Sequence, residues 1–493
     1  MAHDTVVQIT LDTLYMPRST PFELTRPIQW SDVYSEAELY KAALRVYTKP
    51  LFHWRKALST SVDGRTLYDF AGRGLRSLDT IHQALQRRAF TFRPAVALHY
   101  NFNGKHRTIY LAPWEERIVD LLLYRVLNHK LDRWFSPNSY AYREGNFGLD
   151  LCQTRIAAVL RARRPLYVIK RDIADYFATV NHDLLLSKLA ELVYPGDYLF
   201  GLLEQRIHFL YEENGLTQPS TLGIPFGTAI ACLFANIYLT DLDRETESIA
   251  GVSYFRYADD ILLLAPEREA ARQAAQTMEE SLSGLRLGLK ATRGADLLLA
   301  CGSPADSAFT PAAEFRHLGL LFRAGGSIAL SRDKLRKVRN LFSFAFRRSR
   351  RRWKKVTDPA DRAQLLVTIA SETIDQGLRN VAILDYYLKH VDDENQLRIL
   401  DRWLAEEILN LVFGGHKKSH FRKISFGQLR EMGLPSLLHR RRLILRGQIE
   451  SPFFIWQRQK GARAFRGTVA RLPHAKAAAA FSLIPEAAAS KGP

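Results

Sequence analysis

The stretch RYADDILLLA, residues 256–265, constrains the fold more than any other part of the sequence. It places two adjacent carboxylates, Asp259 and Asp260, directly before a run of branched apolar residues that is typical of a buried strand. Adjacent residues on a regular strand point to opposite faces, so both acids reach one site only if they lie at a hairpin turn. Because the preceding VSYFRY is also strand-like, the stretch predicts two strands that meet at a tight acidic turn.

A third acid, Asp172, ends another apolar run, LYVIKRD. If its strand neighbours the hairpin, Asp172 and Asp259 converge, and two carboxylates at such short range resist ionisation. Mg²⁺ prefers a few carboxylates plus substrate phosphates, and two such ions about 3.5–4 Å apart stabilise the attacking and leaving oxygens of phosphoryl displacement. The acids therefore predict a nucleotidyl-transfer site with two Mg²⁺ ions, or Mn²⁺ in their place. A turn cap is the alternative interpretation of the acidic pair.

The net charge of the chain indicates what kind of partner it binds. The chain has 493 residues, is 47% hydrophobic, and carries a formal net charge of +19. Such a charge indicates a polyanion, although a basic ribosomal or membrane-surface protein would share it. The three cysteines form no CxxC pair, so neither a zinc site nor a disulfide framework is predicted. No run of about 18 uncharged apolar residues is present, and we expect a cytoplasmic protein without a membrane partner.

The motifs resemble those of the reverse transcriptases. Tyr257-Ala258-Asp259-Asp260 is similar to their Tyr-x-Asp-Asp motif, and Asp172 followed by Tyr176 and Phe177 is similar to their Asp-and-aromatic motif. Across residues 100–322 further matches follow in family order: GKHRTIYLAPWEERIV, SPNSYAYREG, LGIPFGTAIACLFANIYLTDLD, GLRLGLKATR and FRHLGLLF.

The order of strand, helix, helix and hairpin predicts an α+β fold. The resemblance implies a right-hand polymerase with fingers, a palm with an antiparallel sheet, and a helical thumb, followed by a basic all-helical C-terminal extension. The expected divisions are an N-terminal helical region (1–95), fingers and palm (96–322), a thumb (323–395), a basic helical domain (396–470) and a disordered tail (471–493).

The resemblance also implies residue roles. Asp172 and Asp259 hold the metals with the backbone carbonyl of Ile173, and Asp260 completes the catalytic set. Phe177 is the expected gate against a ribose 2′-hydroxyl, with an ordinary core aromatic as the alternative. Lys290 is the expected general acid to the departing pyrophosphate. The predicted dNTP-binding residues are Lys105, Arg107, Tyr176, Phe177, Phe226, Gly227 and Lys290.

Two of these predictions have their own physical argument. Lys105 and Arg107 are two residues apart in an expected hairpin, so they share a strand face and can both bind a triphosphate. Ordinary solvated surface charge is the alternative interpretation of these two residues. Phe226 stands where the family usually has Gln, which replaces a hydrogen-bonding side chain by a packing surface. Template use is therefore expected to be specialised, slack or partly dispensable.

Basic residues cluster in the region after the expected palm. FRRSRRRWKK, residues 346–355, predicts a phosphate-binding surface with an aromatic that can stack a base, and a solvated charged face is the alternative. The predicted nucleic-acid-binding residues are Arg143, Arg347, Arg348, Arg350, Arg351, Arg352, Trp353, Lys354 and Lys355.

By resemblance, the expected activity is RNA-directed DNA synthesis from dNTPs, with an RNA template and a DNA product. The altered Phe226 motif and the helical extension favour the stand-alone bacterial enzymes of antiphage defence or abortive infection, with a dedicated noncoding RNA as template and a homo-oligomer as one assembly. Alternatives are a template-independent or protein-guided polymerase of that class, a reverse transcriptase of a diversity-generating element or group II intron, and an RNA-binding maturase or scaffold with a vestigial site.

Overall fold

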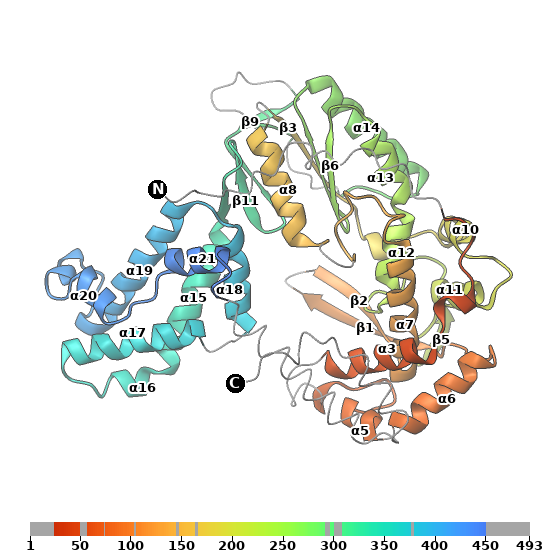
Figure 1. Cartoon of the computed structure of the whole chain (residues 1–493), viewed down its shortest axis with the longest axis horizontal. Helices are drawn as coiled ribbons and strands as arrows, with labels where there is room; N and C mark the ends of the chain where they lie inside the picture. The colour runs from red at the N-terminus through yellow and green to blue at the C-terminus, as the bar shows by residue number, and fades with distance from the viewer. Residues whose placement is uncertain are drawn as a thin grey trace.

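The structure is a computed structural model, and it describes residues 24–49, 57–72, 74–102, 105–143, 147–162, 166–290, 296–299, 308–375 and 379–449. Figure 1 shows a central sheet with helices on its faces, a hairpin and N-terminal helices below it, and a helical C-terminal part to one side. The predicted tail, 471–493, lies outside the described residues. The predicted domain divisions stay predictions.

The central sheet is built from short apolar strands in the order β6-β7-β3-β8-β9. Neighbouring strands are antiparallel except for the parallel β8–β9 pair. The predicted hairpin and its neighbouring strand are therefore confirmed. The strands are β3 (Leu166–Asp172), β6 (Ser253–Tyr257), β7 (Asp260–Ala265), β8 (Leu297–Leu299) and β9 (Thr310–Ala312).

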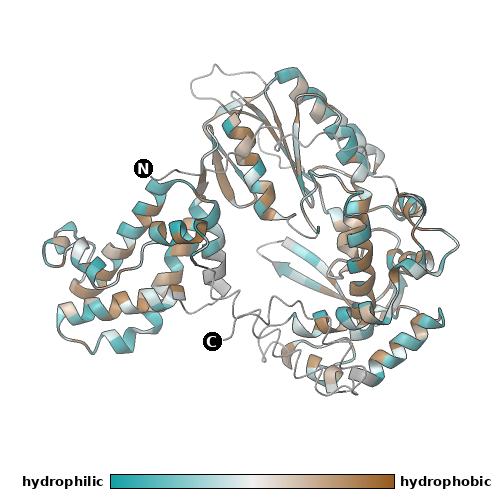
Figure 2. Cartoon of the chain, in the orientation of Figure 1, coloured by the Kyte–Doolittle hydropathy of each residue, from teal (hydrophilic) through white to brown (hydrophobic). Residues whose placement is uncertain are grey.

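Side-chain alternation gives this sheet two buried faces. Ile169, Ile261 and Leu263 join one apolar core with α12 (Ile230–Tyr238) and α14 (Arg268–Gly284), whereas Val168 and Leu262 join a second core. Figure 2 shows that α12 is hydrophobic along its length while α14 has a polar outer side. α12 is accordingly buried almost throughout, and α14 covers the sheet from outside.

A second sheet, in the order β2-β1-β4-β5, forms the predicted fingers hairpin and its extension. β1 pairs antiparallel with β2, and its first two residues, Ala95 and Val96, pair in parallel with β4. The strands are β1 (Ala95–Phe102), β2 (Lys105–Leu111), β4 (Leu210–Glu213) and β5 (Leu216–Pro219). The further helices of this region are α7 (Trp114–Leu131), α9 (Tyr176–Thr179), α10 (His182–Leu192), α11 (Tyr198–Ile207) and α13 (Thr240–Glu247). Of these, α13 packs against β6 and α14.

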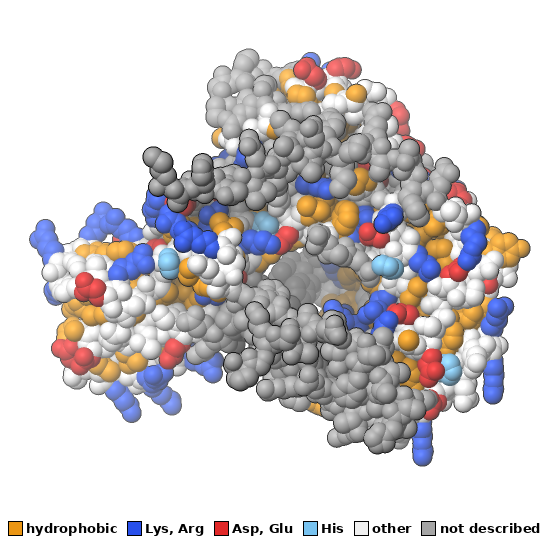
Figure 3. Space-filling model, in the orientation of Figure 1, with side chains coloured by type: hydrophobic (Ala, Val, Ile, Leu, Met, Phe, Trp, Pro, Cys, Tyr) orange, Lys and Arg blue, Asp and Glu red, His pale blue; other side chains and the backbone are white. Residues whose placement is uncertain are grey.

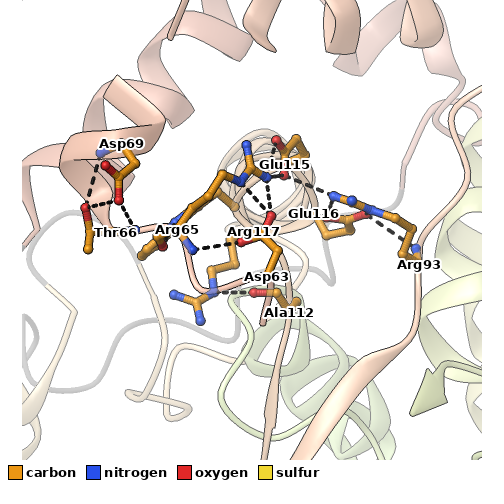
Figure 4. Close-up of polar contacts among 10 residues, drawn as sticks. Asp63, Arg65, Thr66, Asp69, Arg93, Ala112, Glu115, Glu116 and Arg117 are labelled. Atoms are coloured by element: carbon orange, nitrogen blue, oxygen red, sulfur yellow. Dashed lines mark hydrogen bonds and ion pairs between the residues drawn. The ribbon is translucent and has the colours of Figure 1, made fainter. Parts of the chain in front are cut away.

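Salt bridges at the N-terminus of α7 attach the N-terminal region to the fingers (Figure 4). Arg65 Nη2 lies 2.8 Å from Glu115 Oε1, and Arg93 Nε lies 2.6 Å from Glu116 Oε1. Both acids are in the first turn of the helix, where the helix dipole favours negative charge. The N-terminal helices are α2 (Trp30–Val33), α3 (Glu36–Thr48), α5 (Leu67–Gly72) and α6 (Gly74–Gln86).

The C-terminal part is helical and continuous with the second core. The sheet β10-β11-β12 and α8 (Leu149–Ala162) lie between the central sheet and the helices, and apolar residues of all three share one core. The strands are β10 (Glu314–His317), β11 (Leu320–Arg323) and β12 (Ile328–Leu330). The helices are α15 (Arg332–Arg348), α16 (Arg350–Trp353), α17 (Pro359–Asp375), α18 (Arg379–His390), α19 (Glu394–Phe413), the 3₁₀ helix η1 (Lys418–Arg422), α20 (Phe426–Glu431) and α21 (Leu437–Leu445).

These elements confirm the α+β fold class with fingers, palm and helical thumb. Across the part of the chain that is described, none of the helices combines the length and the apolar character that crossing a membrane requires.

Candidate active site

Strand register brings the three predicted acids to one end of the central sheet. Asp172, the last residue of β3, lies opposite Asp260, the first residue of β7. Asp259 lies in the two-residue turn between β6 and β7, and its carbonyl accepts a 3.2 Å hydrogen bond from the backbone N–H of Ile173. The predicted convergence of the acids is thus present, and Ile173 lies directly beside the turn.

The turn needs an unusual backbone conformation. Ala258, its first central residue, has φ +58°, in the left-handed region that costs a residue with a Cβ about 1–2 kcal/mol. The guanidinium of Arg256 donates a 3.2 Å hydrogen bond to the Ala258 carbonyl and stabilises that conformation. The left-handed residue closes the hairpin within two residues and places Asp259 at its tip.

The acids are partly withdrawn from water and repel one another. Burial, followed by the nearby charge of Asp172, raises the pKa of Asp259. Burial also raises the pKa of Asp260 to about 6, although the neighbouring Lys170 opposes this shift. A cation placed between the acids would relieve both effects.

Lys290 supplies one positive charge at this position. Its backbone N–H donates a 3.0 Å hydrogen bond to the carbonyl of Asp172, which fixes the segment beside β3. Its ammonium group contacts Asp172 Oδ1 and lies 3.9 Å from Asp259 Oδ2. The residue is therefore next to the acids, and its role as a general acid stays a prediction.

The acids are suitable ligands for Mg²⁺ but do not form a complete binding site. Within the described residues, no group of three or more His, Cys, Asp or Glu side chains is arranged to hold a metal ion. Asp172 and Asp259 nevertheless present hard oxygen donors on either side of the Lys290 ammonium group, and Mg²⁺ commonly uses one or two carboxylates together with substrate phosphates. The pair therefore fits metals that arrive with a nucleotide.

Aromatic side chains form a wall beside the acids. Phe177 is half-buried, and its ring meets that of Phe226 edge to face with the centroids 5.1 Å apart. The ring of Tyr142 also meets that of Phe177 edge to face, with the centroids 6.4 Å apart, and the guanidinium of Arg107 lies 5.7 Å from the centre of the Phe226 ring. The structure thus joins Phe177, Phe226 and Arg107, three predicted nucleotide-site residues from distant segments, in one continuous series of contacts.

The loop that carries Phe226 is attached to the fingers. The Phe226 carbonyl accepts a 3.0 Å hydrogen bond from the backbone N–H of Tyr110 on β2. Gly227 has φ +103°, and a Cβ there would lie 2.6 Å from Ile109 Cγ2. Gly227 is therefore required for close approach of the loop to β2. Lys105 begins β2, and its side chain lies outside the described part.

Three predicted binding residues have partners inside the fold. Tyr176 is buried, and its hydroxyl donates to the carbonyl of Ala235. The side chain of Arg143 is 2% exposed and pairs with Asp132, so it supports the fingers. The binding roles of both residues stay predictions.

The third is Trp353, which is buried and donates from Nε1 to the carbonyl of Phe346, so its ring is not free to stack a base. The basic residues around it are mostly exposed: Arg347, Arg348, Arg350, Arg351, Arg352, Lys354 and Lys355. Figure 3 shows Lys and Arg side chains on the C-terminal part and near the β1–β2 hairpin, on both sides of the central hollow.

The sequence analysis did not identify the buried ion pair next to the β6–β7 turn. Arg256 is fully buried on β6 and makes two 2.6 Å hydrogen bonds to the carboxylate of Asp243 on α13. Tyr254 donates to the same carboxylate at 2.6 Å. The available signal was an arginine inside an apolar strand, because an arginine is rarely buried without a partner.

Comparison with known proteins supports the interpretation of the motifs. Residues 99–301 match the family model described as reverse transcriptase (RNA-dependent DNA polymerase). Protein YkfC of Escherichia coli strain K12 is 24% identical over 229 residues, which cover 39% of this chain and 60% of that protein. The putative COX1/OXI3 intron 1 protein of Saccharomyces cerevisiae is 24% identical over 187 residues, which cover 37% of this chain and 22% of that protein.

A structure of apo telomerase from Candida tropicalis has a TM-score of 0.40 and 11% identity, covering 71% of this chain and 69% of that chain. The chain spans less than two thirds of the length of the two curated relatives described above. The resemblance to the reverse transcriptases is confirmed over residues 99–301, which are similar in sequence to that family.

Proposed function

We propose that the chain is an RNA-directed DNA polymerase that joins dNTPs by nucleotidyl transfer. The observation that carries this proposal is the register of Asp172 opposite Asp260, with Asp259 at the tip of the adjoining turn. The match of residues 99–301 to the reverse transcriptase family supports the same activity.

In this proposal Asp172 and Asp259 would hold divalent cations together with the nucleotide phosphates. Mg²⁺ is the expected ion, with Mn²⁺ as its substitute, and the bound cations would stabilise charge on the attacking and leaving oxygens. Lys290 releases the carboxylates and turns its ammonium group toward the departing pyrophosphate, where it donates a proton. The contacts of Lys290 with Asp172 and Asp259 support this role, because they hold its ammonium group beside the two acids.

The aromatic wall selects the sugar. The ring of Phe177 contacts the rings of both Tyr142 and Phe226, and these contacts restrict its movement away from a bulkier substrate. A ribose 2′-hydroxyl directed at this ring would clash, whereas a deoxyribose would fit. Arg107 is exposed next to Phe226 and binds the triphosphate by charge-assisted hydrogen bonds.

The experiment that tests this activity measures dNTP incorporation by purified protein with Mg²⁺, with and without added primer and template, in the wild type and in Asp259→Ala. We expect metal-dependent DNA that is absent in the variant and after RNase treatment. Lys188→Ala is the matched control, because this residue pairs with Asp241 on the outside of the fold. Absence of DNA from the wild type in every condition would contradict the proposal and favour an RNA-binding scaffold.

We further propose that the template is a dedicated noncoding RNA and that the enzyme serves antiphage defence, as a monomer or a homo-oligomer. Phe226 supports this proposal, because its side chain offers the template no hydrogen bond. Its ring instead contacts Phe177 and the guanidinium of Arg107. The intron origin named for one relative favours an intron reverse transcriptase as the second candidate.

Sequencing the DNA made by freshly purified protein separates these candidates. A product that copies one small RNA recovered with the protein supports the defence proposal, whereas copying of an intron supports the second candidate. Synthesis that persists after RNase indicates template-independent or protein-guided polymerisation. We expect Phe226→Gln to reduce any RNase-resistant fraction, because it restores an amide that can hydrogen-bond a base.

A further inference from the structure

His317 is a buried polar residue to which the proposed reaction assigns no role. It ends β10, and its side chain is fully buried beside the apolar residues Phe322 and Leu320 of the neighbouring strand. Strand alternation directs Phe315 and His317 to the same inner face, and Phe315 stacks on Phe322. An apolar side chain would satisfy the packing at this position, so a histidine there requires another explanation.

The imidazole faces the third acid of the candidate active site. His317 Nδ1 lies 3.5 Å from Asp260 Oδ1. Among the residues that the structure describes, neither ring nitrogen of His317 nor Oδ1 of Asp260 makes a hydrogen bond. Buried polar atoms are rarely left without a partner, and these face each other across a gap that a movement of about 0.3–0.5 Å would close to ordinary hydrogen-bond length.

The charge states suit a hydrogen bond from the ring to the acid. Burial, together with the smaller effect of the Lys170 charge, lowers the pKa of His317 to about 3, so the ring is neutral at physiological pH and has one N–H to donate. Lys170 Nζ lies 3.6 Å from the same Asp260 oxygen and approaches it from the more exposed side. The ionised carboxylate can therefore accept from the ring on its buried side and interact with the lysine on the other.

The hairpin that carries His317 is itself held in place by a chain of two hydrogen bonds from α8 and α18. Gln153, buried on α8, donates a 3.2 Å hydrogen bond to the carbonyl of Leu318, the residue after His317. The hydroxyl of Tyr386 on α18 donates to the side-chain oxygen of the same glutamine. His317 thus sits where the central sheet, α8 and the helical C-terminal part meet.

We propose that His317 is a positioning residue that donates from Nδ1 to Asp260 and so ties the β10–β11 hairpin to the catalytic turn. This inference rests on the proposed polymerase function. Asp260 lies in register with Asp172 and next to Asp259, so a fixed Asp260 also fixes the start of β7 and the tip that carries Asp259. The hydrogen bond sets the geometry of the acids and takes no part in bond formation.

The test compares two substitutions at the same position. His317→Leu keeps most of the side-chain volume and removes the donor, whereas His317→Asn keeps an N–H donor near the place of Nδ1. We expect His317→Leu to lower kcat about 10- to 100-fold with the KM for dNTP changed less than about threefold, because His317 acts through Asp260 on the turn that carries the proposed metal ligand Asp259. His317→Asn should recover kcat to within about fivefold of the wild type.

A wild-type kcat in His317→Leu would overturn the inference. An equal loss in His317→Asn and His317→Leu would also overturn it, because packing alone would then explain the effect. The midpoints of urea unfolding are measured for both variants, because a lowered midpoint identifies a variant that loses activity through unfolding.

A double-mutant cycle separates this inference from the polymerase proposal. Unfolding equilibria of wild type, His317→Leu, Asp260→Leu and the double variant should show a coupling of about fivefold or more in the equilibrium constant at pH 7.5. Coupling without any DNA synthesis by the wild type would support the hydrogen bond and overturn the polymerase function. Absence of coupling overturns the inference, whatever the activity.

Discussion

The surroundings of Asp260 disfavour its ionised form, because burial raises the pKa of its carboxyl to about 6 from an ordinary value of 3.8. The folded state therefore binds the proton more tightly than the unfolded chain does. The stabilisation from this proton is complete below about pH 4 and is lost as the pH rises through 6. The ionised acid that the proposed reaction requires consequently lowers the free energy of unfolding at neutral pH.

We expect Asp260→Asn to raise the free energy of unfolding at pH 7.5 by about 1–3 kcal/mol in metal-free buffer, and to lower dNTP incorporation. The gain should shrink at pH 4, where both side chains are neutral. Urea unfolding at the two pH values measures the effect, with Asp361→Asn on the exposed side of α17 as the control. A variant that is less stable at pH 7.5 would contradict the argument.

A second prediction at the scale of one residue concerns Phe177 and the proposed preference for dNTPs over rNTPs. Phe177→Val should raise the ratio of kcat/KM for an rNTP to that for the dNTP about 10- to 100-fold, because it removes the ring that we propose to clash with a ribose 2′-hydroxyl. Tyr176→Phe is the matched control: its hydroxyl bonds to Ala235 inside the fold, so its loss should reduce stability and leave the ratio unchanged. A ratio that is unchanged in Phe177→Val would assign the ring to packing alone.

At the scale of elements, the β6–β7 hairpin depends on α13. Arg256 and Asp243 are both buried, so removing one partner leaves the other charge without compensation. Arg256→Ala should therefore lower the free energy of unfolding by about 3–5 kcal/mol. The double substitution Arg256→Met with Asp243→Leu should cost less than Arg256→Ala, because no buried charge remains. Urea unfolding of the three proteins checks this order, and the reverse order would contradict it.

At the scale of the whole molecule, a net charge of +19 makes affinity for nucleic acid depend on salt. Replacing Arg347, Arg348 and Arg351 by Gln should reduce the slope of log K against log salt concentration by about 0.7–0.9 for each phosphate that is no longer neutralised. Fluorescence anisotropy of a labelled RNA–DNA duplex over a salt range of roughly 50 to 300 mM, which spans several-fold ionic strength, measures the slope. An unchanged slope would show that these arginines face solvent and neutralise no phosphate of the nucleic acid.

Trp353→Phe is the control for that measurement. The indole N–H bonds to the carbonyl of Phe346 in the interior, so its loss should lower helix stability without changing the salt slope. A change in slope for this variant would indicate that the tryptophan contacts nucleic acid after all.

The sequence predicted the elements whose pattern is local. The alternating strands and the two-residue acidic turn follow from periodicity and spacing, and both are present. The approach of Asp172 to Asp259 followed only on the condition that their strands are neighbours, which the register of β3 and β7 fulfils. The pattern does not reveal the direction of side chains that depends on distant partners. Tyr176 turns inward to the carbonyl of Ala235, and nothing beside Tyr176 in the sequence reveals that acceptor.

The partnerships of Arg256 with Asp243 and of His317 with Asp260 have the same origin. Each joins residues of different elements, so no spacing rule connects them. An arginine or histidine inside an apolar strand indicates that a buried partner exists, and only the packed fold identifies it.

The order of strands in the central sheet has a consequence during synthesis on the ribosome. β3 emerges early, yet it lies between β7 and β8, which are translated much later. At about 5–20 residues per second, the chain from residue 172 to residue 259 takes roughly 4–17 s to make. Throughout that interval the backbone N–H and C=O groups along both edges of β3 lack their strand partners, so this apolar segment is exposed to aggregation until β7 and β8 have been made.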